Sequence, residues 1–248
     1  MLSGESKIIV VGASGMLAQD LIARLKEYKC SLSLLDIREG TSCGLPVKSI
    51  DITNESSLTT LIYESKPDIV INCAAYTKVD DAEKEQEAAY RINALGAAKL
   101  ASAIRRLDDR DTVLVHYSTD YVFGGEDREE VSNKGNRPIS EGDVTCPVNV
   151  YGQSKRLGDE FVSRILPEQH LILRTSWLHG VSGPNFIDTM LRVGKSQKQV
   201  KVVNDQTGSP TWTGWLAEVT TSLLEKEQRG LFNATCAGGI TWGEYASR

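Results

Sequence analysis

The sequence predicts an α/β fold in which a doubly wound parallel sheet carries a smaller C-terminal lobe. Short apolar runs rich in Val, Ile and Leu, typical of buried parallel strands, recur along the chain. Helical patterns with one apolar face separate these runs, which indicates βαβ units with right-handed crossovers. Small or polar residues follow the strands. Because ligands bind beyond the carboxyl ends of such strands, these positions are the candidate site.

Composition narrows the class of protein. The chain has 248 residues, of which 25% are charged and 40% hydrophobic, with a net charge of −5. Without a basic stripe we expect no nucleic-acid partner, and strand-sized apolar runs predict no membrane span. The polar start, residues 1–6, argues against a signal peptide, so we expect a cytoplasmic protein. The odd number of cysteines, 5, and the absence of CxxC predict free thiols.

The first strand and turn carry a dinucleotide-binding pattern. Residues 7–11 form a β-branched run, and Gly12-Ala13-Ser14-Gly15-Met16-Leu17-Ala18 follows at the start of a helical pattern. Such a turn lets backbone N–H groups approach a pyrophosphate at the positive end of a helix. The pattern is GxxGxxA, and Ala18 is small enough for close packing. It predicts a Rossmann-like core, with candidate cofactor-binding residues Gly12, Ser14, Gly15, Met16 and Leu17.

A second strand, residues 31–35, ends at Asp36. An acid about 20 residues past the glycines, at the end of a strand, can accept hydrogen bonds from the adenosine ribose. This favours NAD, whereas Arg38 is placed to meet a 2′-phosphate, so NADPH and NADH both stay open. Asp51 and Ile52, which end another short segment, are candidates for the adenine edge.

A third strand, residues 68–73, leads into small residues that suit a cofactor backbone: the candidates there are Cys73, Ala74, Ala75 and Thr77. A helix is expected from residue 86 to 107. Asn93 lies within it, and it is either a cofactor-binding residue or an exposed, self-capped one.

The fourth strand, residues 112–117, precedes Ser118 and Thr119, and a helix is expected from residue 150 to 166. Tyr151 and Lys155 are i and i+4 on that helix and therefore share a face. A Tyr-x-x-x-Lys spacing arises by chance about half the time in a chain of this composition, so the motif alone is nearly uninformative. Its position after a Rossmann-like half and a strand that ends in Ser-Thr makes it a candidate proton-transfer site. Residues 124–146 are polar, and we expect a solvated loop that can act as a lid.

The remaining elements complete the core and the lobe. A strand at 170–175 leads to Trp177, which either stacks on a sugar or a base or simply packs against the protein. A helix follows Asn185, and residues 204–211 form a polar turn. A helix at about 213–227, an apolar segment at 231–233 and a helix opening near residue 241 follow. The three histidines are scattered, so no metal site is expected, and His116 and His170, in or beside strands, are expected to be structural.

These residues together resemble a known family, the dTDP-4-dehydrorhamnose reductases, a branch of the extended short-chain dehydrogenases. The resemblance covers residues 7–246 and rests on segments more specific than Tyr-x-x-x-Lys. They are Gly12-x-x-Gly15, Asn72-Cys73-Ala74-Ala75-Tyr76-Thr77-x-Val79-Asp80, Tyr117 to Phe123, Pro147-x-Asn149-x-Tyr151-Gly152-x-Ser154-Lys155, Arg174-Thr175-Ser176-Trp177, Asn185-Phe186 and Asp205-Gln206-x-Gly208-x-Pro210-Thr211.

The resemblance implies that the chain reduces the 4-keto group of dTDP-4-dehydrorhamnose to dTDP-L-rhamnose with NADPH or NADH. It implies catalytic roles for Tyr151 as proton donor, Lys155 as a partner of the phenol and of the nicotinamide ribose, and Thr119 as a hydrogen-bond partner of the carbonyl. Lys155 and Tyr151 would thus also bind the cofactor, together with Asn93. The substrate-binding residues would be Thr119, Asp120, Trp177, Asn185 and Gln206. Residues 1–174 would form the cofactor-binding core and residues 175–248 the substrate-binding lobe, interleaved with the last core strand and helix.

The resemblance also implies further family features. A homodimer is possible, and some members bind Mg²⁺ at a dimer contact, for which the sequence offers no acidic set. The 124–146 loop is longer than the family leads us to expect, and members continue past residue 245, so we expect the lobe to be incomplete. Two other functions remain open: a non-catalytic subunit like the β subunit of methionine adenosyltransferase, and an extended short-chain enzyme for another nucleotide sugar.

Overall fold

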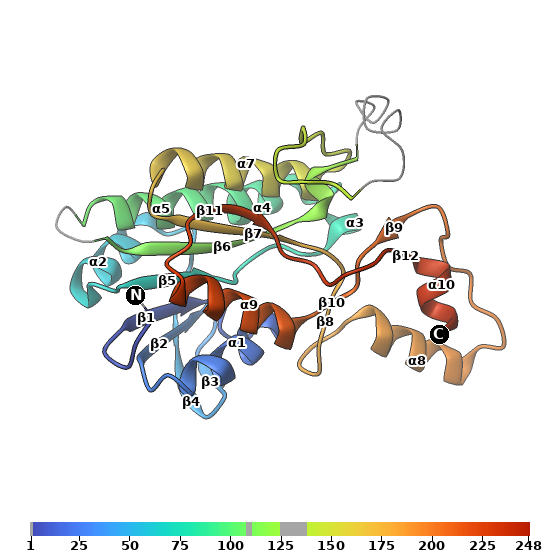
Figure 1. Ribbon diagram of the computed structural model, residues 1–248, viewed down its shortest axis with the longest axis horizontal. Helices are drawn as coiled ribbons and strands as arrows, with labels where there is room; N and C mark the ends of the chain where they lie inside the picture. Colours follow the sequence, from blue (N-terminus) through green and yellow to red (C-terminus); the bar gives the residue numbers. More distant parts are fainter. Residues whose placement is uncertain (1, 108–110, 125–137) are drawn as a thin grey trace.

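A parallel sheet forms the centre of the molecule (Figure 1). The computed structural model describes residues 2–107, 111–124 and 138–248. Its strands are β1 (Lys7–Val11), β2 (Ser31–Asp36), β3 (Gly40–Ser42), β4 (Leu45–Ser49), β5 (Ile69–Asn72), β6 (Val113–Thr119), β7 (His170–Thr175), β8 (Leu178–His179), β9 (Thr207–Gly208), β10 (Thr211–Trp212), β11 (Gly230–Asn233) and β12 (Ile240–Thr241). The expected lid loop falls largely on residues 125–137, outside the described part.

The helices are α1 (Met16–Lys26), α2 (Glu55–Ser65), α3 (Val79–Ala82), α4 (Gln86–Tyr90), the π-helix η1 (Arg91–Gly96), α5 (Ala97–Arg105), the short η2 (Asp120–Val122), α7 (Val150–Ile165), α8 (Phe186–Ser196), α9 (Thr213–Glu225) and α10 (Trp242–Ser247). Among the described residues, none of them has the length and apolar character to cross a membrane.

The order of strands in the main sheet is β11-β7-β6-β5-β1-β2-β4-β3. The chain moves outward from β1 to β2 and then returns to β5 on the other side of β1, where both pairings are parallel. The order therefore reverses between β1 and β5. In a doubly wound sheet a ligand binds at this point, beyond the carboxyl ends of the strands.

Successive side chains along each strand point to opposite faces of the sheet, so the core has two halves, one on each face. Ile8 and Val10 pack with α1 and α9 on one face, and Ile9 and Val11 pack with α2, α5 and α7 on the other. Figure 1 shows these helices on opposite sides of the sheet. Both faces of the central strands are thus buried, which explains the near-continuous apolar runs.

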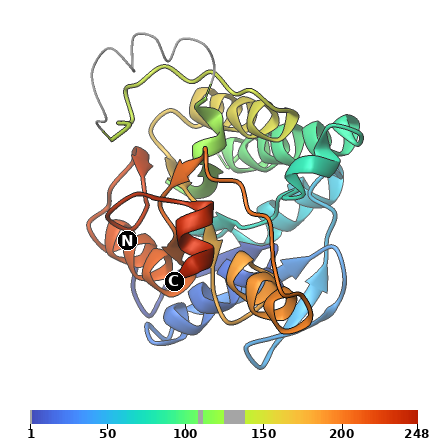
Figure 2. The same cartoon turned by 90° about the vertical axis from the view of Figure 1, so that its right-hand side faces the viewer.

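The lobe combines α8 and α10 with two small sheets, β8–β10 and β9–β12. Figure 2 shows α8 and α10 on the same side of the molecule, and Phe186 of α8 packs on Trp242 of α10 with ring centroids 4.4 Å apart. In contrast, β11 pairs in parallel with β7, and α9 packs on α1. Residues after 174 therefore lie both in the main sheet with its covering helices and outside it, while the division into a core of residues 1–174 and an interleaved lobe of residues 175–248 stays a prediction.

The structure confirms the predicted parallel sheet and differs locally in two ways. The hairpin of β3 and β4 was not predicted, because three residues of polar sequence carry too little alternation. The helix expected over 86–107 ends at Arg105 and is interrupted by η1. Asn93 lies in this π-helical turn, is 1% exposed and bonds Tyr76 and Ser154, so the alternative of an exposed or self-capped Asn93 was wrong.

Close packing of α7 on η1 gives a test of this architecture. A Cβ on Gly158 would lie 2.4 Å from the carbonyl oxygen of Asn93, whereas a Cβ on Gly194 of α8 meets nothing within 4 Å. We expect Gly158→Ala to cost about 1–3 kcal/mol of unfolding free energy through overpacking. Gly194→Ala should instead stabilise by up to about 1 kcal/mol, because alanine has the higher helix propensity. Urea unfolding measures both, and a Gly158→Ala protein as stable as the wild type contradicts the packing described.

Candidate functional site

The turn between β1 and α1 lies against the end of β5. Gly12 has φ +78°, and a Cβ there would lie 2.5 Å from the amide nitrogen of Ala74. Only glycine fits this approach at low cost. Ser14 and Gly15 are exposed, and Gly15, the N-cap of α1, makes no side-chain cap hydrogen bond. The first amides of α1 therefore have no capping side chain and face the reversal point of the sheet, which suits an anionic group.

Asp36, at the end of β2, closes this turn from the other side. Its Oδ2 accepts from the Ser14 amide at 2.9 Å, and its Oδ1 accepts from the Ile37 amide at 2.7 Å. The carboxylate thus fixes the turn, and it lies at the strand end predicted for ribose recognition. Its role in binding a ribose stays a prediction.

Asn93 shapes the segment after β5. Its Oδ1 accepts from the Tyr76 amide at 2.8 Å, and its Nδ2 donates to the Tyr76 carbonyl at 3.0 Å and to Ser154 Oγ at 2.9 Å. The side chain therefore holds residues 74–77 in place and ties them to α7. Because it is buried and already bonded, any effect on a cofactor would pass through that backbone. Its predicted cofactor contact stays a prediction.

The other predicted cofactor residues differ in exposure. Cys73, Ala74 and Ala75 are partly exposed and Thr77 is exposed. Burial raises the pKa of the Cys73 thiol to about 12, so this group stays protonated at neutral pH. The side chains of Leu17 and Ile52 lie in the core, and Met16 is partly buried, so these three can offer only backbone atoms or edges. Asp51 is exposed and accepts from the Thr53 amide at 2.8 Å.

The first turn of α7 places Tyr151. Asn149 caps the helix by accepting from the Gly152 amide at 2.7 Å, and Glu83 Oε1 accepts from the Val150 amide at 2.8 Å. The ring of Tyr121 lies edge-on to that of Tyr151, with centroids 5.6 Å apart. Burial is the main cause that raises the pKa of the Tyr151 phenol above its usual value, and a hydrogen bond with the Thr119 side chain acts in the opposite direction. The phenol is therefore protonated at neutral pH.

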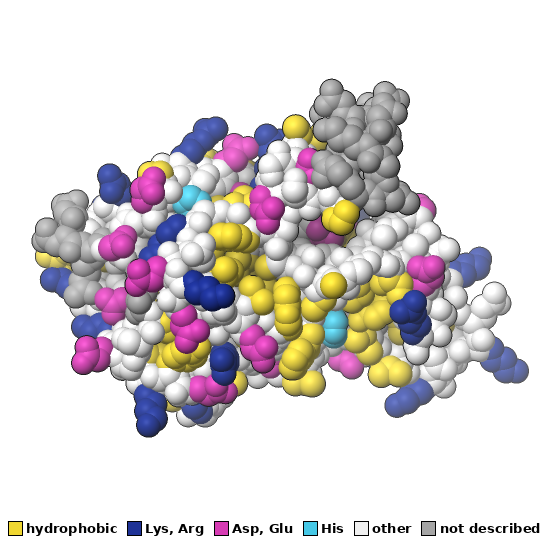
Figure 3. All heavy atoms as spheres, viewed as in Figure 1, with side chains coloured by type: hydrophobic (Ala, Val, Ile, Leu, Met, Phe, Trp, Pro, Cys, Tyr) yellow, Lys and Arg dark blue, Asp and Glu magenta, His cyan; other side chains and the backbone are white. Residues whose placement is uncertain are grey.

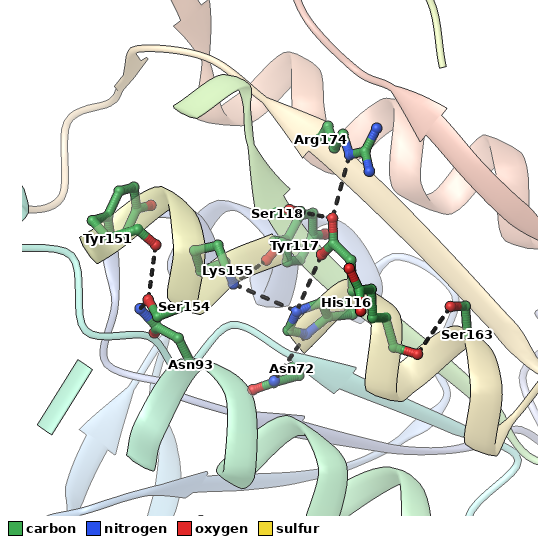
Figure 4. Close-up of polar contacts among 12 residues, drawn as sticks. Asn72, Asn93, His116, Tyr117, Ser118, Tyr151, Ser154, Lys155, Ser163 and Arg174 are labelled. Carbon is green, nitrogen blue, oxygen red and sulfur yellow. Dashed lines mark hydrogen bonds and ion pairs between the residues drawn. The ribbon is translucent and has the colours of Figure 1, made fainter. Parts of the chain in front are cut away.

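Lys155 lies one turn further along α7 and points toward β6 (Figure 4). It is 2% exposed, and its Nζ donates to the Tyr117 carbonyl at 2.6 Å. Burial lowers the pKa of the ammonium from 10.5 to about 8, against the attraction of Asp159 and Cys73. Lys155 thus carries a charge at neutral pH that it can lose within about one pH unit.

Thr119 and Asp120 join the ends of β6 and β7. Thr119 Oγ1 accepts from the Tyr121 amide and donates to Asp120 Oδ1, both at 3.2 Å. Asp120 Oδ2 accepts from Ser176 Oγ at 2.7 Å, and burial raises the pKa of this carboxyl. Both side chains lie beside Tyr151, as a shared site requires, but their substrate contacts stay predictions.

A buried polar set beneath Lys155 was not predicted from the sequence. It contains Asp159, which accepts from Ser118 Oγ at 2.8 Å and from Arg174 Nε at 3.3 Å, and His116, whose Nε2 lies 3.5 Å from Lys155 Nζ. One signal was available: Asp159 is i+4 from Lys155, so it shares the face of α7 that carries Tyr151 and Lys155.

The lobe holds the other predicted substrate residues. Trp177 has φ +45°, which is uncommon for a residue with a side chain. Its ring stacks on that of Trp242 at 3.4 Å and 10°. A sugar that stacks on this face therefore requires Trp242 to move. Asn185 caps α8 by accepting from the Asp188 amide, and Gln206 is exposed.

Among the described residues, no group of three or more His, Cys, Asp or Glu side chains is placed to hold a metal ion. On the face shown in Figure 3, Lys and Arg lie scattered among Asp and Glu, and hydrophobic side chains gather at its centre.

Known proteins share this chain's sequence and fold. The family model described as the RmlD substrate binding domain matches residues 6–248. A dTDP-4-keto-6-deoxy-D-glucose reductase of Streptomyces niveus is 38% identical over 96% of this chain and 75% of its own length. The crystal structure of a dTDP-4-dehydrorhamnose reductase from Clostridium acetobutylicum is 36% identical, with a TM-score of 0.85 over 97% of this chain and 78% of the other.

A second dTDP-4-dehydrorhamnose reductase, from Bacillus anthracis and solved in complex with NADP, is 35% identical, with a TM-score of 0.82 over 98% of this chain and 79% of the other. The family model covers nearly the whole chain, and relatives of this identity match over about three quarters of their length. The chain therefore belongs to the RmlD family, that of the dTDP-4-dehydrorhamnose reductases.

Proposed function

We propose that the chain reduces the 4-keto group of a dTDP-linked 6-deoxyhexulose, with dTDP-4-dehydrorhamnose as the substrate and dTDP-L-rhamnose as the product. One observation carries the proposal: Lys155 is buried as a cation at the carboxyl end of β6, one helical turn from the protonated phenol of Tyr151. The names of relatives that match nearly the whole chain supply the class of substrate.

NADPH or NADH fits the residues at the reversal point of the sheet. A Cβ on Gly12 would fill the space beside Ala74, and the first turn of α1 offers uncapped amides to a pyrophosphate. Asp36, at the end of β2, would accept hydrogen bonds from a ribose, which favours NAD. The Bacillus anthracis relative was solved in complex with NADP, so both dinucleotides stay open. When bound, the nicotinamide supplies a hydride to the keto carbon.

The chain's own residues supply the proton and the orientation. Tyr151 donates its phenolic proton to the oxygen of the forming alcohol, as a general acid. The Lys155 ammonium stabilises the phenolate that remains, because a nearby cation favours the anionic form. Thr119 hydrogen-bonds the keto oxygen and fixes its position relative to Tyr151.

Two alternative functions, a non-catalytic binding subunit and a reductase of another nucleotide sugar, give different results in an assay of cofactor oxidation. A binding subunit without catalysis has no use for a buried cation beside a phenol, and burial of Lys155 costs free energy that a purely structural module can avoid. A reductase of another nucleotide sugar would keep Tyr151 and Lys155 and differ in the lobe. A panel of dTDP- and UDP-linked keto sugars, each with NADPH and with NADH, separates these functions.

Replacing Tyr151 tests the assigned chemistry. We expect the wild type to oxidise NADPH or NADH with the dTDP-linked keto sugar, and Tyr151→Phe to lower kcat by roughly 10²–10⁴, the usual effect of losing a general acid. Its cofactor dissociation constant should change far less than kcat, because the Gly12 turn and the other candidate cofactor residues stay in place. Tyr90→Phe is a matched control. It removes a hydroxyl of α4 that donates to Gln153 of α7, the helix that carries Tyr151, and Tyr90 has no role in the proposed proton transfer.

Two results would count against the proposal. Cofactor binding without turnover of any sugar in the panel supports the binding subunit instead. Equal activity of the wild type and Tyr151→Phe contradicts the role given to the phenol.

The charge of Lys155 predicts a pH dependence. The free protein holds the pKa of this ammonium at about 8, so the cation is present below that pH and is lost as the pH rises through it. We expect kcat/KM, which reports the free enzyme, to fall about tenfold per pH unit above that value. Lys155→Arg keeps its charge at this pH, so its residual activity should lack this alkaline decline. A wild-type profile that stays level to two units above that pKa contradicts the assignment.

A further inference from the structure

The buried set beneath Lys155 contains an anion that the proposed chemistry does not use. Asp159 is 4% exposed and lies on α7, one turn beyond Lys155. Its Oδ2 accepts from Ser118 and from Arg174, at 2.8 and 3.3 Å. Its Oδ1 makes no hydrogen bond with any described residue. A carboxylate buried with one oxygen unbonded costs free energy, so its presence calls for a function.

His116 lies between this oxygen and Lys155. The Oδ1 of Asn72 accepts from the Ala74 amide at 3.2 Å, so its Nδ2 is the atom that faces His116 Nδ1, at 3.1 Å. An amide nitrogen only donates, so Nδ1 accepts and the ring proton lies on Nε2. Burial, and then the Lys155 charge, hold the pKa of His116 well below its usual value, so the ring is neutral.

The proton on Nε2 determines which neighbouring groups this nitrogen can bond. His116 Nε2 lies 3.5 Å from Lys155 Nζ and 3.8 Å from Asp159 Oδ1. Since Nε2 and Nζ both carry hydrogens, Lys155 does not donate to the ring. The N–H of His116 instead faces the unbonded oxygen of Asp159. The Nε2 atom of the neutral ring thus lies close to both charged groups.

Asp159 supplies the negative charge that offsets the two cations of the buried set, Lys155 and Arg174. Arg174 of β7 and Lys155 of α7 are cations, and Arg174 Nε lies 3.3 Å from Asp159 Oδ2. Burial raises the pKa of the Asp159 carboxyl, whereas the charges of Lys155 and Arg174 act in the opposite direction and favour its anionic form. Cys73 at the end of β5 also faces Lys155, but its thiol is neutral, and η1 contributes the uncharged Asn93. Without the carboxylate, two buried cations would remain, and Lys155 would lose its proton most easily.

We propose that Asp159 is a positioning residue for the reduction: acting across the neutral His116 ring, its carboxylate keeps Lys155 protonated and turned toward β6. The inference rests on the proposed function for its role in turnover. The effect of Asp159 on the pKa of Lys155 concerns the free protein, and it holds whether or not the assigned sugar is the substrate.

A titration of Lys155 tests this directly. In the full chain labelled with ¹³C and ¹⁵N in lysine, the Lys155 side-chain signal is identified by its loss in Lys155→Arg. We expect Asp159→Asn to lower the pKa of Lys155 by about one unit or more, as loss of a nearby opposite charge does. The alkaline decline of kcat/KM should move down by the same interval. Glu160→Gln is the matched control, because it removes the same charge one residue further, where Glu160 pairs with Arg156 and Arg164 near solvent.

The outcomes separate this inference from the proposed function. If Asp159→Asn lowers the pKa of Lys155 but the wild type turns over no sugar, the inference holds and the proposed function is wrong. An unshifted Lys155 in folded Asp159→Asn, or a loss of activity that is equal at every pH, overturns the inference. If Asp159→Asn does not fold, the wild type decides: the carboxyl ¹³C signal of Asp159 must show an inflection at the pH where Lys155 titrates, and its absence overturns the inference.

Discussion

The hydrogen bond from Lys155 to the Tyr117 carbonyl is the contact on which the candidate site depends. It joins α7 to β6 inside the protein, where a cation is costly unless its donors are satisfied. The contact requires α7 to lie close to β6. Gly152 and Gly158 let α7 approach η2 and η1, because a Cβ on either glycine would collide with the carbonyl oxygen of Tyr121 or of Asn93. The same closeness places Tyr151 beside Thr119. The geometry of the site therefore follows from the packing of one helix.

Close packing also shapes the predicted cofactor-binding half of the site, at the point where the strand order reverses. Reversal of the strand order between β1 and β5 brings the Gly12 turn against Ala74, and Asn93 holds the segment after β5 through both backbone groups of Tyr76. Asn93 also bonds Ser154 of α7. The π-helical turn η1 thus couples the predicted nucleotide-binding edge to the helix that carries Tyr151 and Lys155. Such turns are frequent at functional sites.

Local patterns in the sequence predicted much of this arrangement. Apolar runs predicted the strands β1, β2, β5, β6 and β7, which the structure confirms. The Gly-rich turn, and the position of Tyr151 and Lys155 after the strand that ends in Ser-Thr, predicted the two halves of the candidate site, and the roles of these residues stay predictions. Asp159 escaped prediction because a single Asp on an amphipathic helix normally faces water. Its burial depends on Arg174 and His116, which come from other strands. The stacking of Trp242 on Trp177 likewise joins residues far apart in the chain, which no local pattern reveals.

Reduction of a keto group at C4 of a nucleotide sugar, by the residues around Tyr151 and Lys155, can be measured through the hydride itself. The most direct measurement uses a reduced nicotinamide cofactor with deuterium at the transferred position of its C4, with NMR of the sugar product. We expect one deuterium at C4 of the dTDP-linked 6-deoxyhexose. Formation of a product without deuterium at that carbon, or with deuterium at another carbon, would contradict the proposed function.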